Sequence, residues 1–151
     1  MNDIVVFGAG KIGSAVAKLL AHSGDYRVLI ADQDERALAR LPKLEYLQTR
    51  VVDVSKPAQL KAAMRKKKAA LSACSFTANP GIARAALEGG LSYFDLTEDV
   101  ETTRAVKAVS RKARAGQIFM PQCGLAPGFV SICAHALASQ FDKLDEVRMR
   151  V

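Results

Sequence analysis

The chain has 151 residues and a formal net charge of +7, and half of its residues are apolar. This length suits one domain with one sizeable core, and the apolar content excludes an intrinsically disordered chain. The basic residues gather mainly in residues 61–68 and 104–114, in the pattern of solvated outer helix faces. No aromatic side chains are interleaved with them, so we expect no nucleic acid partner.

Neither targeting nor metal chemistry is indicated. The first apolar strand begins within a few residues of Met1, and no apolar run reaches membrane-spanning length. We therefore expect a cytoplasmic protein that binds no membrane. The three cysteines, Cys74, Cys123 and Cys133, and the two histidines lack metal-ligand spacing, which favours reduced thiols and no metal site.

A glycine-rich turn follows the first apolar strand. Residues 4–7 form the strand, residues 8–13 read Gly-Ala-Gly-Lys-Ile-Gly, and residues 11–22 have the apolar spacing of a helix. We expect Gly8 to turn the chain, Gly10 to let a phosphate approach the backbone, and Gly13 to let the helix pack on the strand. The unpaired amides at the helix start would bind a diphosphate. The cofactor-binding residues predicted in this turn are Gly8, Gly10, Lys11, Ile12 and Gly13.

Asp32 ends the second predicted strand, residues 27–32, and stands 19 positions after Gly13. A carboxylate there can accept hydrogen bonds from the adenosine ribose and would repel a 2′-phosphate. Strand, glycine triplet, helix and acidic strand end rarely coincide by chance, and together they predict a dinucleotide site. The carboxylate favours NAD over NADP as the cofactor.

Strands and helices continue to alternate along the rest of the chain. Six strands separated by helices are typical of the α/β Rossmann fold, a doubly wound parallel sheet in the order 3-2-1-4-5-6 with helices on both faces. The further predicted strands are residues 45–52, 69–74, 92–96 and 118–122, and the further helices are residues 34–41, 57–67, 79–89, 100–115 and 129–141.

The carboxyl-terminal residues do not fit that fold. Residues 145–151 alternate like a half-buried strand, and such a strand needs a partner sheet that the chain does not supply. We expect residues 1–141 to form the dinucleotide-binding domain. Residues 142–151 would begin a second domain, for substrate binding and dimerisation, most of which is absent.

In a doubly wound sheet the ligand lies beyond the carboxyl ends of the strands. Asp53 and Val54 follow the third strand and would reach the adenine, although Asp53 is equally well explained as a turn residue before Ser55. Ala73 and Cys74 end the fourth strand and, together with Ser75, would pass beneath the ribose and the nicotinamide. No histidine or lysine stands near Cys74 in sequence, so a buried strand-end residue explains it better than a reactive thiol.

Residues 95–99 are the densest acidic cluster. Thr97 or Asp99 would cap the helix over residues 100–115, because carboxylates and hydroxyls stabilise a helix start. Asp95 lies inside the strand end, where capping does not explain it. It is the candidate catalytic residue, placed to orient a substrate amine or accept its proton, with a structural role as the alternative.

With these residues in place, the chain resembles the amino-terminal cofactor domain of the saccharopine dehydrogenase-like family, which includes saccharopine reductase and lysine 6-dehydrogenase. The resemblance covers essentially the whole chain and rests on residues 6–13, 93–98 and 123–128. The first segment is shared by many Rossmann families, and the other two are more particular. The saccharopine reductase branch usually has aspartate before the proline of the last segment, where this chain has Ala126, so the chain is more similar to the lysine 6-dehydrogenase side.

This resemblance implies an NAD(P)-dependent oxidoreductase of amino-acid metabolism that transfers a hydride between the cofactor and a carbon–nitrogen bond of an amino acid or related amine. It also implies a second domain that supplies much of the substrate pocket and a homodimer contact. Two other interpretations remain open. One is a nucleotide-sensing regulatory Rossmann domain without redox chemistry, and the other is a nucleic-acid-binding protein suggested by the net charge.

Overall fold

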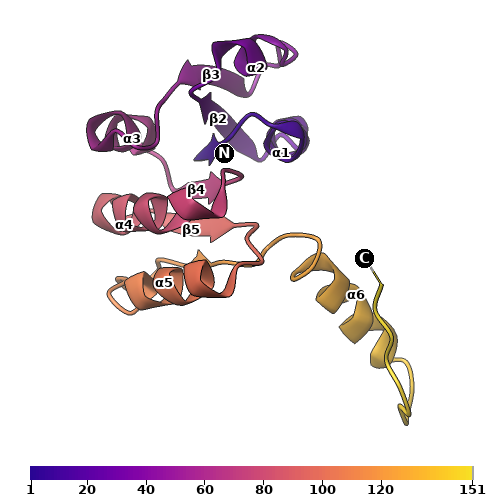
Figure 1. Cartoon of the computed structure of the whole chain (residues 1–151). Coiled ribbons are helices and arrows are strands. Elements are labelled where there is room, and N and C mark those ends of the chain that lie inside the picture. Colours follow the sequence, from indigo (N-terminus) through magenta and orange to yellow (C-terminus); the bar gives the residue numbers. More distant parts are fainter. Residues whose placement is uncertain (151) are drawn as a thin grey trace.

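The computed structural model of the chain describes residues 1–150 (Figure 1). Six parallel strands form one sheet in the order β3-β2-β1-β4-β5-β6, which confirms the predicted Rossmann topology. The strands are β1 (Asn2–Phe7), β2 (Tyr26–Asp32), β3 (Leu47–Val51), β4 (Ala69–Ser72), β5 (Ser92–Asp95) and β6 (Phe119–Met120).

Helices cover both faces of this sheet. The helices α1 and α2 pack on one face, and α3, α4 and α5 pack on the other (Figure 1). Their bounds are α1 (Lys11–His22), α2 (Glu35–Ala39), α3 (Pro57–Met64), α4 (Asn79–Gly89), α5 (Val100–Ser110) and α6 (Phe129–Ala138), with a short 3-10 turn, η1 (Phe76–Ala78), before α4.

Strand β1 lies at the centre and divides the core into two layers. Val5 and Phe7 point to the layer beneath α3, α4 and α5, while Ile4 and Val6 point to the layer beneath α1 and α2. Successive side chains of a strand face opposite sides of the sheet, so a strand covered on both faces has to be apolar throughout. This explains why the first predicted strand is a continuous apolar run.

Several elements are shorter than the sequence pattern predicts. Helix α3 ends at Met64 instead of residue 67, because Arg65 leaves the helical conformation with ψ of 129° and Lys66 adopts a left-handed conformation with φ of 61°. Strand β6 has two residues instead of five, and within residues 1–150 it is an edge strand whose one partner is β5. Helix α5 ends at Ser110, five residues before the predicted end.

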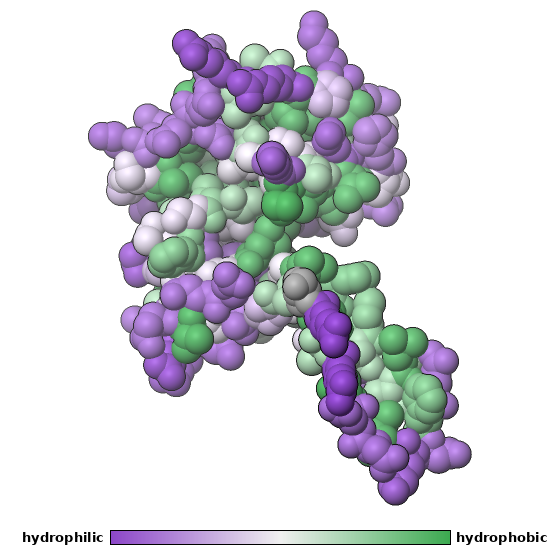
Figure 2. Space-filling model, turned by 45° about the vertical axis from the view of Figure 1, so that its right-hand side comes forward, coloured by the Kyte–Doolittle hydropathy of each residue, from purple (hydrophilic) through white to green (hydrophobic). Residues whose placement is uncertain are grey.

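The segment from α6 to residue 150, here called the C-terminal arm, projects away from the sheet (Figures 1 and 2). No residue of α6 is buried, and apolar side chains such as Phe129, Ile132 and Phe141 are 60% to 69% exposed. The predicted strand over residues 145–151 is wrong over residues 145–150, which form no strand, and Val151 lies outside the described residues. A lone strand without a neighbouring edge leaves its backbone groups unpaired, so it does not form.

No helix within residues 1–150 is both long enough and apolar enough to cross a membrane.

Candidate functional site

A cleft of about 370 Å³ opens where β1, β2 and β4 end. Six of the ten predicted cofactor residues line it, namely Gly8, Gly10, Asp32, Val54, Ala73 and Cys74. Ser75, expected beneath the cofactor with Ala73 and Cys74, also lines the cleft, and so do four residues that were not predicted, Ala31, Gln33, Val52 and Ala78. Most of these lie at or just beyond the end of a strand, so the rule that ligands bind at the carboxyl ends of strands was the signal that could have found them.

Glycine is present at the three positions of the turn for different structural reasons. Gly8 has φ of 99°, and a Cβ there would lie 2.8 Å from the carbonyl oxygen of Ala73. A Cβ on Gly13 would collide with the carbonyl oxygen of Gly8. A Cβ on Gly10 would meet nothing within 4 Å. The packing of the chain therefore requires Gly8 and Gly13, whereas Gly10 leaves space that the protein does not fill.

Helix α1 begins beside that space without a side-chain cap. Gly10 occupies the N-cap position, and the first turn carries no acidic residue. The first amide that bonds inside the helix is that of Ser14, which donates to the carbonyl oxygen of Gly10 at 2.9 Å. The amides of Lys11, Ile12 and Gly13 precede it, and such amides attract an anion through their N–H groups and the helix dipole. The site therefore fits a phosphate group.

Asp32 is tied to this turn. Its Oδ2 accepts a hydrogen bond from the amide of Ala9 at 2.5 Å, and its Oδ1 accepts one from the amide of Asp34 at 2.8 Å. A carboxylate oxygen can accept more than one hydrogen bond, so both retain capacity for a ligand hydroxyl. The carboxylate thus lies in the cleft, at a position set by the glycine turn itself.

Asp53 does not line the cleft. Its Oδ1 accepts hydrogen bonds from the amide of Ser55 at 2.9 Å and from the hydroxyl of Ser55 at 2.6 Å, and these bonds hold the pKa of the carboxyl below its usual value. The residue shapes the turn before α3, which was the alternative reading of the sequence. Val52 and Val54 line the cleft in its place, and a contact between Asp53 and adenine stays a prediction.

Ala73 and Cys74 line the cleft just beyond β4, as predicted. Burial raises the pKa of the Cys74 thiol to about 11. The thiol is therefore protonated near neutral pH, and a protonated thiol is a poor nucleophile. This favours the structural interpretation of Cys74 over the reactive one.

Asp95 is fully buried and lies outside the cleft. Its carboxylate accepts hydrogen bonds from the hydroxyl of Tyr93 at 2.9 Å, the amide of Thr97 at 3.0 Å and the amide of Gln122 at 3.3 Å. Burial, with the nearby Asp95 charge, raises the pKa of Tyr93 above its usual value. The carboxylate thereby holds the end of β5 to the segment after β6, and its catalytic role stays a prediction.

Asp99 caps α5 as expected. Its Oδ1 accepts from the amide of Thr102 at 2.7 Å, and this bond lowers the pKa of the carboxyl. Thr97 lies just before the cap, where its hydroxyl accepts from the amide of Asp99 at 3.1 Å. The acidic cluster therefore serves the chain's own backbone at this point.

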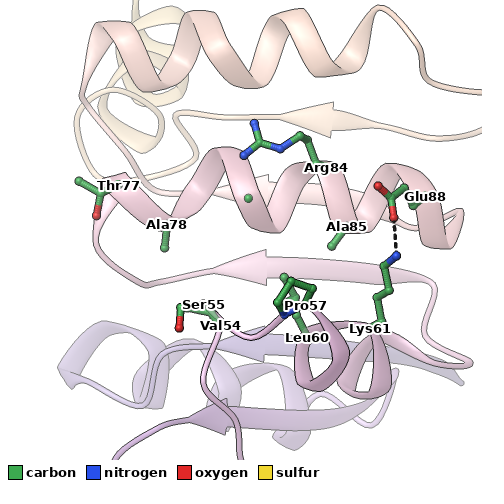
Figure 3. Close-up of a pocket in the computed structure, with 11 residues that line it drawn as sticks. Val54, Ser55, Pro57, Leu60, Lys61, Thr77, Ala78, Arg84, Ala85 and Glu88 are labelled. Carbon is green, nitrogen blue, oxygen red and sulfur yellow. Dashed lines mark ion pairs between the residues drawn. The ribbon is translucent and has the colours of Figure 1, made fainter.

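A groove of about 570 Å³ lies between α3 and α4 (Figure 3). Val54 and Ala78 line both hollows. Ser55 and Thr77 flank the end near the cleft, and an ion pair between Lys61 and Glu88, 2.8 Å long, stands at the other end. The cleft and the groove therefore adjoin at Val54 and Ala78.

No group of three or more histidine, cysteine, aspartate or glutamate side chains that could hold a metal ion occurs within residues 1–150.

Residues 4–120 match the family described as the saccharopine dehydrogenase NADP binding domain. Among solved structures, apo saccharopine dehydrogenase (L-Glu forming) from Saccharomyces cerevisiae aligns with a TM-score of 0.78 and 18% identity, over 92% of this chain and 31% of the yeast chain. The present chain thus spans about a third of the length of that enzyme.

Two further structures share the fold at lower similarity. The NAD(P)-binding domain of an exopolyphosphatase-related protein from Archaeoglobus fulgidus aligns with a TM-score of 0.67 and 12% identity, over 92% of this chain and 99% of that one. A wide-type short-chain dehydrogenase/reductase from Veillonella parvula, in complex with NADP, aligns with a TM-score of 0.61 and 13% identity, over 80% of this chain and 67% of that one. At such identities these likenesses show the fold alone.

Proposed function

Because the chain belongs to the family of saccharopine dehydrogenase NADP-binding domains, we propose that its cleft binds a nicotinamide dinucleotide for hydride transfer at a carbon–nitrogen bond. The observation that carries this proposal is the uncapped start of α1 beside the open space at Gly10, with the Asp32 carboxylate in the same cleft. Diphosphate and ribose are neighbours in a dinucleotide, and these two features have the matching chemistry.

The diphosphate would lie against the turn of residues 8–13. The amides of Lys11, Ile12 and Gly13 would donate to its oxygens, and Gly10 would let it reach the backbone without a side chain in the way. The first turn of α1 carries no carboxylate that would repel this charge. The chain supplies a fixed set of donors here, so little ordering is needed on binding.

The adenosine would lie on the other side of Asp32. Its ribose hydroxyls would donate to the Asp32 carboxylate, which the amides of Ala9 and Asp34 already hold in place. The adenine would enter between Val54 and Ala78, where the cleft meets the groove shown in Figure 3. Apolar walls with polar groups at the rim suit a flat heterocycle.

The choice between NAD and NADP has evidence on both sides. The description of the family points to NADP, against the preference expected from the sequence. The position of Asp32 supports NAD, because a carboxylate beside the ribose would repel a 2′-phosphate. We retain NAD as the preferred cofactor and make Asp32 the residue that sets the preference.

The substrate is proposed to be an amino acid or a related amine. The bound cofactor would supply hydride transfer, and the small side chain of Ala73 on the cleft lining would let the nicotinamide lie close to the sheet. The role of this chain would then be to bind the cofactor, orient it and exclude water from one side of it. A proton acceptor is not assigned, because Asp95 is buried outside the cleft.

The C-terminal arm is proposed to belong to a second domain that completes the substrate pocket and mediates a homodimer, in an enzyme of the cytoplasm. Two observations support this. The arm exposes several apolar side chains on α6 (Figure 2), and exposed apolar patches mark surfaces that contact another domain or protein. The yeast saccharopine dehydrogenase is also about three times as long as the part that this chain covers.

Isothermal titration calorimetry of the chain with NAD and with NADP tests the binding proposal. We expect one dinucleotide per chain, with NAD bound more tightly. Gly10→Ala adds one methyl group to open space in the cleft and should weaken binding. Absence of dinucleotide binding would refute the function, and tighter binding of NADP would refute only the role of Asp32.

Turnover separates the enzyme from a regulatory sensor. Hydride transfer to or from an amine, followed by the absorbance of the reduced nicotinamide in the longest available form of the protein, would support the oxidoreductase. Cofactor binding that changes assembly without any turnover across an amine panel would support the nucleotide-sensing alternative.

A further inference from the structure

A second concave site lies beside α3, at a distance in sequence from the glycine turn. It has a volume of about 480 Å³ and is lined by Leu29, Arg50, Ala62, Ala63, Arg65, Lys66 and Lys67. None of these residues lines the cofactor cleft. The pocket is therefore distinct from the cofactor cleft.

Four of the seven lining residues are cationic, and the lining includes no carboxylate. One of the four, Lys67, forms an ion pair: its Nζ lies 3.7 Å from Oδ1 of Asp3. Asp3 is held more closely by Arg27, at 2.7 Å, so it neutralises Lys67 weakly. Within the described part of the chain, Arg50, Arg65 and Lys66 have no ion-pair partner. Like charges on a concave surface repel one another, and this arrangement favours a multivalent anion.

Lys66 has the backbone conformation usually taken by glycine. It follows the end of α3 with φ of 61°, and the amide of Lys67 donates to the carbonyl oxygen of Met64 at 3.0 Å to close the turn. Glycine would adopt this conformation without strain. A lysine there adds a positive charge to the pocket at a cost to the fold, which is the pattern expected of a functional position.

Arg50 reaches the pocket from the edge strand β3. Its Nη1 donates to the carbonyl oxygen of Ala62 in the last turn of α3, at 3.3 Å. This bond holds the planar guanidinium beside the other cations and leaves most of its five N–H donors free. Guanidinium groups bind phosphate oxygens in pairs, which a lysine cannot do.

We propose that this basic pocket, made by Arg50, Arg65, Lys66 and Lys67, binds an oligophosphate, meaning a molecule with two or more adjacent phosphate groups. Adjacent phosphates carry several negative charges on one molecule, which the four cationic side chains that line this pocket can balance. The pocket carries no aromatic side chain, so the recognition concerns the phosphates and not a base. Inorganic oligophosphate and the tail of a nucleoside triphosphate share this chemistry. The proposal is independent of the dinucleotide function.

The test is a titration of the ¹⁵N-labelled chain with inorganic tripolyphosphate at low ionic strength, followed by amide chemical shifts. We expect saturable shifts at Arg50, Ala63 and residues 65–67, and an affinity that falls at least about tenfold when salt is raised to 0.2 M. Shifts confined to residues 8–13, or no saturable binding, would overturn the proposal. The localisation separates this site from the diphosphate site of the proposed function.

Two sets of variants sharpen the test. The double variant R50Q/R65Q should weaken tripolyphosphate binding at least about tenfold, while R111Q/R114Q, which removes the same charge from exposed positions at the end of α5, should weaken it less than about twofold. Equal effects of the two double variants would overturn the proposal in favour of unspecific attraction.

The single variant Lys66→Gly should raise the melting temperature and lower the affinity together. Raised stability with unchanged affinity would refute a binding role for this strained lysine.

Parallel titration with ATP distinguishes the source of the phosphates. The same shifts with tighter binding than tripolyphosphate support a nucleotide, and the same shifts with equal or weaker binding support an inorganic ligand. ATP shifts without any response to tripolyphosphate would overturn the pocket as an oligophosphate site.

Discussion

The starts of α1 and α5 differ in what satisfies their backbone amides. Both helices follow a strand of the parallel sheet, so both begin at its carboxyl edge. Helix α5 is capped from within, because Asp99 accepts from the amide of Thr102. Helix α1 has glycine at its cap and no side-chain acceptor. The start of α5 therefore contributes to stability, and the start of α1 leaves its amides available for a ligand anion.

The comparison also shows that similar sequence patterns at two helix starts can have different roles, one in stability and one in binding. Both starts come at a strand end followed by small or acidic residues. At α5, Asp95 and Asp99 of the acidic cluster accept hydrogen bonds from backbone amides and from the Tyr93 hydroxyl. At α1 the nearby Asp32 belongs to a different strand and keeps its carboxylate in an open cleft. An acidic residue at a strand end thus indicates a ligand-binding role only when its carboxylate also faces a cavity.

The largest expected effect comes from Gly13→Ala, which tests whether α1 must lie as close to β1 as it does. The added Cβ would collide with the carbonyl oxygen of Gly8. The turn and the helix would have to separate, at a cost of about 1–3 kcal/mol in the free energy of unfolding. Urea denaturation measures this loss, and dinucleotide affinity should fall as well. A variant with unchanged stability would show that the helix start is more adaptable than its packing indicates.

Gly10→Ala is the matched substitution that should leave the fold intact. Its Cβ meets no protein atom within 4 Å, and the φ of this residue is −67°. We expect an unchanged unfolding midpoint and dinucleotide affinity reduced by about tenfold to a hundredfold, or about 1.4–2.8 kcal/mol. Denaturation and calorimetry on the same preparation make the comparison. Full affinity in this variant would mean that the diphosphate does not approach the helix start.

Asp32→Ala removes the proposed ribose acceptor. Loss of its charged hydrogen bonds should weaken NAD binding by about 1–3 kcal/mol, and NADP binding should weaken less because a repulsion is lost at the same time. Calorimetry with both cofactors measures the two changes. Asp32→Asn is the control, since it keeps the side-chain size but removes the charge. Equal losses for NAD and NADP would exclude this residue as the source of cofactor preference.

Asp99→Ala should lower the melting temperature by roughly 2–4 °C, the effect of a lost N-cap in a domain of this size. Dinucleotide affinity should not change, because α5 does not contribute to the cleft. This outcome would sharpen the contrast between a helix start that stabilises and one that binds. Reduced affinity in the variant would break the contrast.

The same cap gives the smallest effect, on the pH dependence of stability. The hydrogen bonds with Thr102 lower the pKa of the Asp99 carboxyl below its ordinary value in an unfolded chain. The cap therefore stabilises the fold fully above that value, and its contribution is lost as the pH falls through the lower folded pKa. Thermal denaturation between pH 2 and pH 7 should show a steeper acid loss for the native chain than for Asp99→Asn. Parallel curves would show that the cap does not titrate in this range.

The parts of the fold that sequence reasoning could predict are those made by neighbours along the chain. The β1 strand, the glycine turn and α1 follow from an apolar run, three glycines and helical spacing within 22 residues. The strand order follows from the alternation of strands and helices. Element ends were less predictable, because the left-handed turn at Lys66 and the unpaired edge of β6 depend on what lies beside them.

For the site, the sequence identified the residues but not all of their directions. Gly10 and Asp32 lie in one cleft as expected, whereas the carboxylate of Asp53 turns to Ser55 and Val52 takes a place on the cleft lining. Adjacent residues at a strand end point different ways, and hydrogen bonds with the following turn decide which of them faces the ligand.

The amino-acid sequence by itself determined the alternating architecture, the phosphate-type turn and the acidic residue that ends β2, because each depends on periodicity or on residues close in the chain. Only the tertiary structure decided that Val52 and Ala78 line the cleft together with Gly10, that Asp95 is buried against the segment after β6, and that the C-terminal arm remains exposed. Those outcomes depend on contacts between segments dozens of residues apart, and the pairing of parallel strands is what brings such segments together.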